Sequence, residues 1–167
     1  VAPIFEDNNR AQTLNIYGSS EWQSGMGRIN IGSINYRHTG VAKTIKSNGV
    51  ITGYLGSSSV TFEEETSISL LDDLDIDWTL DHLAGVFNTN NHTVKVGTFN
   101  SSNGTKPRTL NFGSSEILIT AYGNFTSNNV NTTVNAGTSH IKFLGFSNGF
   151  VGYDSQVFYD VTYYAQA

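Results

Sequence analysis

The chain has 167 residues, no cysteine and a formal net charge of −5, with 14% of its residues charged and 38% hydrophobic. The lack of cysteine excludes a disulfide framework and a thiolate metal site. A net negative charge without a basic run argues against nucleic acid and anionic membrane as partners. No apolar run reaches the roughly 18 residues of a membrane-spanning helix. Since the chain begins at Val1 without an apolar leader, we expect a secreted protein whose signal peptide has been removed.

The first third of the chain is typical of short β-strands separated by turns. Residues 1–10 contain Pro3 and a polar run, and we expect them to form an extended N-terminal arm that docks against protein. Residues 11–167 would then form one domain. The apolar alternation changes phase at Gly32-Ser33, which predicts a β-bulge. Asn48-Gly49 predicts a hairpin over residues 41–55, because both central residues of a type I′ turn need positive φ.

An acidic stretch follows, with eight of the fourteen acidic residues between Glu63 and Asp81. From residue 74 to residue 80 apolar and polar residues alternate without a break, which predicts a strand. One face of this strand would carry Leu74, Ile76, Trp78 and Leu80. The other face would carry a row of carboxylates that includes Asp73, Asp75 and Asp77.

Carboxylates in such a row lie about 6.6 Å apart along the strand and need a cation, a basic partner or water. An EF-hand is excluded, because Trp78 stands where that loop needs glycine. A different calcium site formed by Asp73, Asp75 and Asp77 stays open. The alternatives are a solvated face and a face paired with Arg28, Arg37 or lysines, and we favour these two over calcium.

The rest of the chain again favours strands. Residues 82–87 are compatible with one helical turn, and the apolar run over residues 117–122 is typical of a strand buried on both faces. Turn signals every 8–12 residues or so and the lack of a long helix predict a single all-β domain. We therefore expect an antiparallel β-sandwich or jelly roll without an internal repeat.

Trp22 is the candidate for sugar binding, because it lies in the polar loop from Gly18 to Gly27 and offers a ring face for stacking. The alternating carboxylates also resemble the acidic strand of jelly-roll β-glucanases, with aspartates in place of glutamates. That chemistry needs two carboxylates roughly 5–5.5 Å apart. The four histidines are scattered and match no zinc motif.

Two terminal segments carry a further resemblance. Asn135-Ala136-Gly137-Thr138 and the alternating run from Phe158 to Gln166 are similar to the last strands of camelysin-like biofilm-fibre subunits. The arm leading into Thr13-Leu14-Asn15-Ile16 is similar in layout. In that family a terminal strand completes the sheet of a neighbouring subunit. The resemblance thus implies that residues 1–10, or the segment after them, are donated to another copy.

The sequence therefore favours a secreted, non-enzymatic structural protein that assembles with copies of itself into a cell-surface filament or appendage. The separation of charge supports head-to-tail contact, because acids dominate residues 63–81 while the first third holds Arg28, Arg37, Lys43 and Lys46. The alternative is a carbohydrate-binding module or lectin-like adhesin domain with glycans as partners. A jelly-roll glycosidase is the third hypothesis. We expect no cofactor apart from the calcium considered above.

Overall fold

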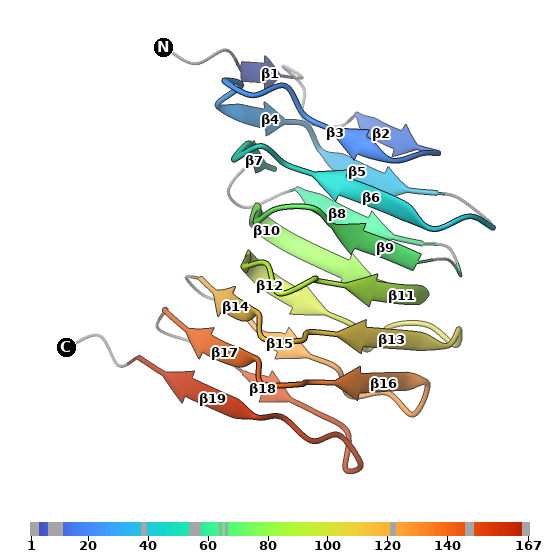
Figure 1. The fold of residues 1–167 in the computed structure, drawn as a ribbon, viewed down its shortest axis with the longest axis vertical. Helices are drawn as coiled ribbons and strands as arrows, with labels where there is room; N and C mark the ends of the chain where they lie inside the picture. The colour runs from blue at the N-terminus through green and yellow to red at the C-terminus, as the bar shows by residue number, and fades with distance from the viewer. Residues whose placement is uncertain are drawn as a thin grey trace.

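The chain folds as a parallel β-solenoid, in which strands stack coil upon coil from one end to the other (Figure 1). This computed structural model describes residues 4–6, 12–37, 40–53, 58–63, 65, 67–120, 123–145 and 149–164. Every strand pairing among these residues is parallel. No described segment is a helix long and apolar enough to cross a membrane.

Each coil has three sides, which we number in chain order. The first side carries β1 (Ile4–Glu6), β4 (Arg28–Asn30), β7 (Ile51–Thr52), β10 (Leu74–His82), β12 (Val94–Asn100), β14 (Glu116–Ile119), β17 (His140–Phe143) and β19 (Asp160–Tyr163). The second side carries β2 (Thr13–Ile16), β5 (Ser33–Tyr36), β8 (Ser59–Phe62), the second halves of β10 and β12, β15 (Phe125–Thr126) and β18 (Phe150–Val151). The third side carries β3 (Ser20–Glu21), β6 (Lys43–Lys46), β9 (Ser67–Leu70), β11 (Gly85–Asn88), β13 (Arg108–Asn111) and β16 (Thr132–Asn135). Because β10 and β12 run through the corner, the first two sides form one 13-stranded sheet, and the third is a separate 6-stranded sheet.

The core is the interior of the coils, filled by the inward member of each alternating pair. Along the second side, Phe99, Phe125 and Phe150 form a stack with ring centroids 5.0 and 5.5 Å apart and interplanar angles of 13°. Offset stacking of this kind adds to the free energy gained by burying the rings. The period-two pattern that predicted strands therefore also fixes which side chains fill the solenoid.

The prediction of an antiparallel β-sandwich or jelly roll is wrong. Alternation separates inward from outward side chains, but it is the same for parallel and antiparallel strands. Within the described ranges, the frequent turn signals join the three sides of a coil and make no hairpins. Asn48 (φ 51°) and Gly49 (φ 76°) adopt the predicted positive φ. However, they form the corner between β6 and β7, which lie in different sheets.

Three local predictions are also wrong. The phase change at Gly32-Ser33 marks the corner from β4 to β5 and not a bulge within one strand. The expected helical turn over residues 82–87 is the end of β10 followed by β11. In the run over residues 117–122, Ile117 and Ile119 are buried while Leu118 is only half-buried, so β14 has one inward face.

The chain also contains a structural repeat, which the sequence prediction denied. Paired residues in neighbouring coils lie between 19 and 26 positions apart, from Thr79–Thr98 to Phe99–Phe125. This uneven coil length hides the repeat from a search at one fixed period.

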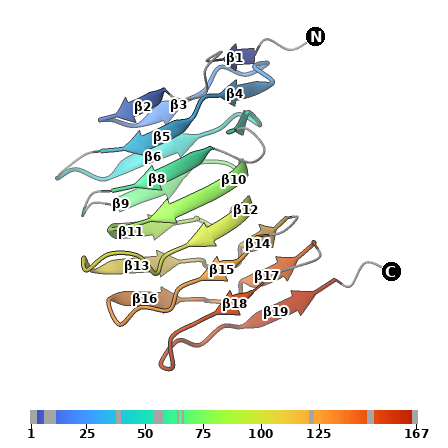
Figure 2. The same ribbon diagram turned by 180° about the vertical axis from the view of Figure 1, so that it is seen from behind.

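Part of the predicted N-terminal arm belongs to the solenoid. Ile4–Glu6 pairs in register with Arg28–Asn30 of the same chain and forms the first strand of the first side. The remaining residues of the arm lie outside the described part of the chain. Figure 2 shows β1 at one end of the stack and β18 and β19 at the other.

Candidate functional site

The predicted acidic strand exists as β10, but it changes phase at the corner between the first and second sides. Its register with β12 shifts between Ile76 and Thr79, so that Asp77 and Trp78 together face Gly97. A Cβ at Gly97 would lie 2.6 Å from the Trp78 carbonyl oxygen, so only glycine fits there. Trp78 consequently faces outward with 37% of its surface exposed, and its predicted place on the inward face is wrong.

The three aspartates singled out as a calcium site each have a separate partner. Asp75 Oδ2 lies 2.8 Å from Lys95 Nζ on the next coil. Asp77 pairs with Arg28, whose guanidinium also donates to the Gly53 carbonyl oxygen at 3.4 Å. Asp73 Oδ1 accepts a hydrogen bond from the Thr93 amide at 2.7 Å. Among the described residues, no three His, Cys, Asp or Glu side chains form a group that could hold a metal ion.

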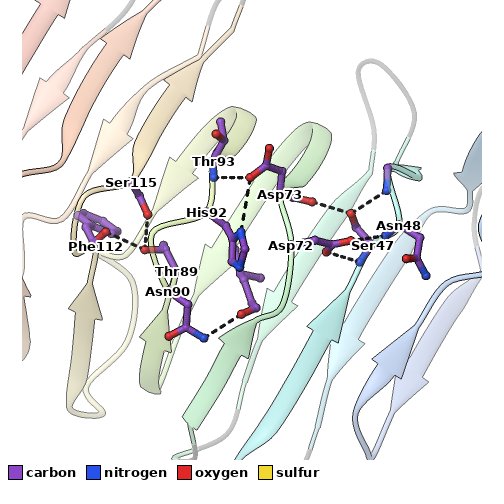
Figure 3. A network of polar contacts seen from close by, with 12 residues as sticks. Ser47, Asn48, Asp72, Asp73, Thr89, Asn90, His92, Thr93, Phe112 and Ser115 are labelled. Atoms are coloured by element: carbon purple, nitrogen blue, oxygen red, sulfur yellow. Dashed lines mark hydrogen bonds and ion pairs between the residues drawn. The ribbon is translucent and has the colours of Figure 1, made fainter.

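The corner between the third and first sides has an open hollow of about 390 Å³, lined by Gly49, Asp72, Asp73 and His92. Figure 3 shows that its polar groups point at neighbouring coils. The Asp72 carboxylate accepts hydrogen bonds from the amides of Ser47 (2.6 Å) and Asn48 (2.5 Å). His92 Nδ1 lies 3.8 Å from Asp73 Oδ1. Because Asp72 binds the preceding coil and Asp73 binds the following one, we assign the corner a structural role.

The same corner continues as a stack of turns in the later coils. Ser115 donates to Thr89 Oγ1 at 2.6 Å, and Thr89 donates to the Phe112 carbonyl oxygen at 2.9 Å (Figure 3). Gly137 has a φ of +60°, and a Cβ there would lie 2.3 Å from the Gly113 carbonyl oxygen. The corner therefore fixes the spacing of the coils and requires glycine where they approach most closely.

The interior holds the titratable side chains of His82 and Arg108, which were not singled out from the sequence. His82 is 1% exposed, and its Nδ1 lies 3.2 Å from Ser101 Oγ. Burial, with a smaller contribution from the Arg108 charge, lowers the pKa of His82 to about 3. Arg108 is 2% exposed and donates to the carbonyl oxygens of Asn103 and Gly104. His82 is therefore neutral in the folded chain at pH 7.

Trp22 does not stand free in its loop as the sequence suggested. Its side chain is half-buried and packs against the core, and its Nε1 is buried without a hydrogen-bond partner among the described residues. Its backbone is bound to the neighbouring coil through Lys46 and Asn48.

The second side carries two outward polar rows that sequence reasoning missed. One row consists of Thr13, Ser33, Ser59, Thr79 and Thr98. The other consists of Asn15, Asn35, Thr61, Asp81, Asn100 and Thr126. Asn100 donates to Asp81 Oδ1 at 2.8 Å, and burial raises the pKa of Asp81. The sequence pattern behind both rows is a hydroxyl residue, an apolar residue and a polar residue in a row, and this pattern recurs in successive coils.

The two ends of the solenoid carry most of its incompletely buried apolar surface. The half-buried apolar side chains that pack on the core are Leu14, Ile16, Trp22 and Met26 near one end, and Val134, Phe150, Phe158 and Val161 near the other. Six of the twelve exposed large apolar side chains in the described residues follow residue 150: Val151, Tyr153, Val157, Tyr159, Tyr163 and Tyr164. The apolar side chains of the interior are thus covered along the length of the solenoid and incompletely covered at its two ends.

Comparisons with protein-family models, curated proteins and solved structures gave no match.

Proposed function

We propose that the chain is a non-enzymatic structural module that assembles end to end with copies of itself at a cell surface. The proposal rests on the exposure of the Tyr163 ring. Its ring continues an inward row and stacks on Phe143 with centroids 4.5 Å apart and planes 8° apart, yet 55% of the residue is exposed. The exposed face of this core-position ring would be buried if a further coil stacked on it.

The backbone at the ends supports the same proposal. Among the described strands, β19 pairs only with β17, and β1 pairs only with β4. Unpaired edge strands are templates for pairing with another chain. Since all strands run parallel, the C-terminal edge of one copy meets the N-terminal edge of the next in the same direction. Such a contact is heterologous and does not close, so it generates a filament.

The secreted location rests on the sequence. A polar, weakly charged chain without cysteine fits an extracellular structural protein, and the terminal resemblance to camelysin-like fibre subunits implies the same setting. The earlier form of this hypothesis, an exchanged strand between sandwich domains, is replaced by stacking of solenoid coils.

The test is a concentration series in the analytical ultracentrifuge with electron microscopy of the same samples. A Val157→Glu/Tyr159→Glu variant changes two side chains that are 77% and 68% exposed near the C-terminal end. We expect it to weaken association at least about tenfold, because charge must be desolvated in the contact. The matched control is Val41→Glu/Leu71→Glu, which changes exposed residues in the second and third coils, away from the C-terminal end. A chain that stays monomeric, or equal effects of both variants, would refute the proposal.

A second candidate function is glycan binding along the two polar rows of the second side. Neighbouring coils repeat these hydroxyl and amide groups every 4.8 Å or so, which suits a linear polymer with regularly spaced hydroxyls. Thr79→Val/Thr98→Val removes two hydroxyls at nearly constant volume. If a glycan array identifies a ligand, this variant should lose about thirtyfold in affinity, at roughly 1 kcal/mol per hydrogen bond. Thr109→Val on the third side is the control. An array without a bound glycan would exclude this function.

A further inference from the structure

The two ends of the solenoid differ in how many sides their last coil has. β19 lies on the first side, one coil beyond β18 on the second side and two coils beyond β16 on the third. At the other end, β1, β2 and β3 occupy the three sides of a single coil. The last described coil thus has its first side only, whereas the first coil has all three.

Outward rows connect the two ends. One row on the first side joins Ile4, Arg28, Ile51, Asp75, Lys95, Leu118, Lys142 and Thr162. The row on the second side that begins at Asn15 ends at Val151, which pairs with Thr126. Both ends therefore present the same rows, and a stacked copy can continue them in register.

We infer that neighbouring copies share one coil. In this coil β19 of one copy forms the first side, and β2 and β3 of the next copy form the second and third sides. Asn15 of the next copy then pairs with Val151, and Tyr163 takes the register position on Ile29 that Phe5 holds within a single chain. This inference rests on the proposed end-to-end assembly and specifies its register.

The shared coil requires β1 to leave the edge of β4. β1 has three residues and pairs with β4 alone, whereas β19 has four residues and runs in the same direction on the same side. Within a single chain β1 covers the edge that β19 of another copy would use. β1 therefore competes with assembly and limits its strength.

The interior surfaces fit this arrangement. Phe150 ends the aromatic stack of the second side and is half-buried, and Leu14 and Ile16 of β2 are half-buried at the other end. On the third side, the Gln156 amide donates to the carbonyl oxygens of Ser127 and Thr132, both at 2.9 Å. These two hydrogen bonds hold residues 152–159 beneath β16. In the shared coil, β3 of the next copy would lie on residues 152–159.

Cysteine cross-linking tests the register, because the chain has no cysteine of its own. Asn15→Cys and Val151→Cys variants are mixed as full chains and oxidised. Adjacent parallel strands lie about 4.8 Å apart, which is within the Cα separation that a disulfide spans. We expect the disulfide-linked mixed dimer to form at least about tenfold faster with this pair than with the control pair Asn15→Cys and Val41→Cys. Assembly would raise the effective concentration of the two thiols of the first pair.

The outcomes separate the two proposals. Absence of association in the ultracentrifuge overturns both end-to-end assembly and the shared coil. Association without faster cross-linking of Asn15→Cys with Val151→Cys overturns the shared coil alone. A second full-length variant, Phe5→Pro, weakens β1 because proline has no amide proton. It should strengthen association several-fold while Ile4→Val leaves association unchanged, and weaker association of Phe5→Pro would overturn the competition between β1 and β19.

Discussion

Acid should destabilise the solenoid through His82, because this residue is buried as the neutral imidazole. Its pKa is about 3 in the folded chain and 6.5 when unfolded. Above pH 6.5 neither state binds the proton, and His82 contributes nothing to the pH dependence. Below pH 6.5 the unfolded state binds a proton that the folded state excludes, so stability falls as the pH falls. Between pH 6.5 and pH 4 the loss is about 2.5 pH units at 1.36 kcal/mol each, or roughly 3 kcal/mol.

The His82→Gln variant removes this titration. Its stability at pH 7 will be lower, since the His82 ring packs 6.3 Å from the rings of Phe62 and Phe87. The informative quantity is therefore the slope of the unfolding free energy against pH, measured by urea denaturation from pH 7 to pH 4. Phe62→Leu is the control, because it also disturbs the packing but keeps His82. We expect a flatter slope in His82→Gln and the wild-type slope in Phe62→Leu. Parallel profiles for all three proteins would refute the reasoning.

Two further predictions concern the corner and the acidic strand. Gly137→Ala should lower the unfolding free energy by about 1–3 kcal/mol, because of its positive φ and the close Gly113 carbonyl, whereas Gly18→Ala has open space and should cost little in the same denaturation assay. Equal losses of unfolding free energy in the two variants would contradict the conclusion that this corner requires glycine where the coils approach most closely. The melting temperature should be indifferent to millimolar calcium and to chelator but fall with rising ionic strength, because Asp75 and Asp77 pair with Lys95 and Arg28. A drop of several degrees in chelator that disappears in Asp75→Asn would instead establish a calcium site.

The sequence was sufficient to predict which side chains face the core along most of β10. Leu74, Ile76 and Leu80 are buried as expected, with exposures of 3%, 1% and 0%. Trp78 departs from the pattern because the corner inserts one extra residue against Gly97. A corner of this kind is fixed by the neighbouring coil, so the strand's own alternation could not reveal it.

Strand direction could not be predicted from alternation, but one signal for stacked coils was present. Thr109-Leu110-Asn111 and Thr133-Val134-Asn135 are 24 residues apart, and each is followed two positions later by a positive-φ glycine, Gly113 or Gly137. The structure places these segments side by side in β13 and β16. The neighbouring coils differ in length, so this repeat is clear over only two of them.

The three aspartates considered for calcium bind separate partners for a related reason. In a solenoid, the nearest polar group to an outward side chain usually belongs to the coil above or below, some twenty residues away in the sequence. Arg28 reaches Asp77 across the intervening coil at Gly53, where no side chain stands in the way. Three aspartates that are neighbours in the sequence are thereby divided among three different partners. The ends of the solenoid lack one of these neighbouring coils, so their half-buried apolar side chains remain open. This is why we place the interaction surface at the ends and not on the acidic strand.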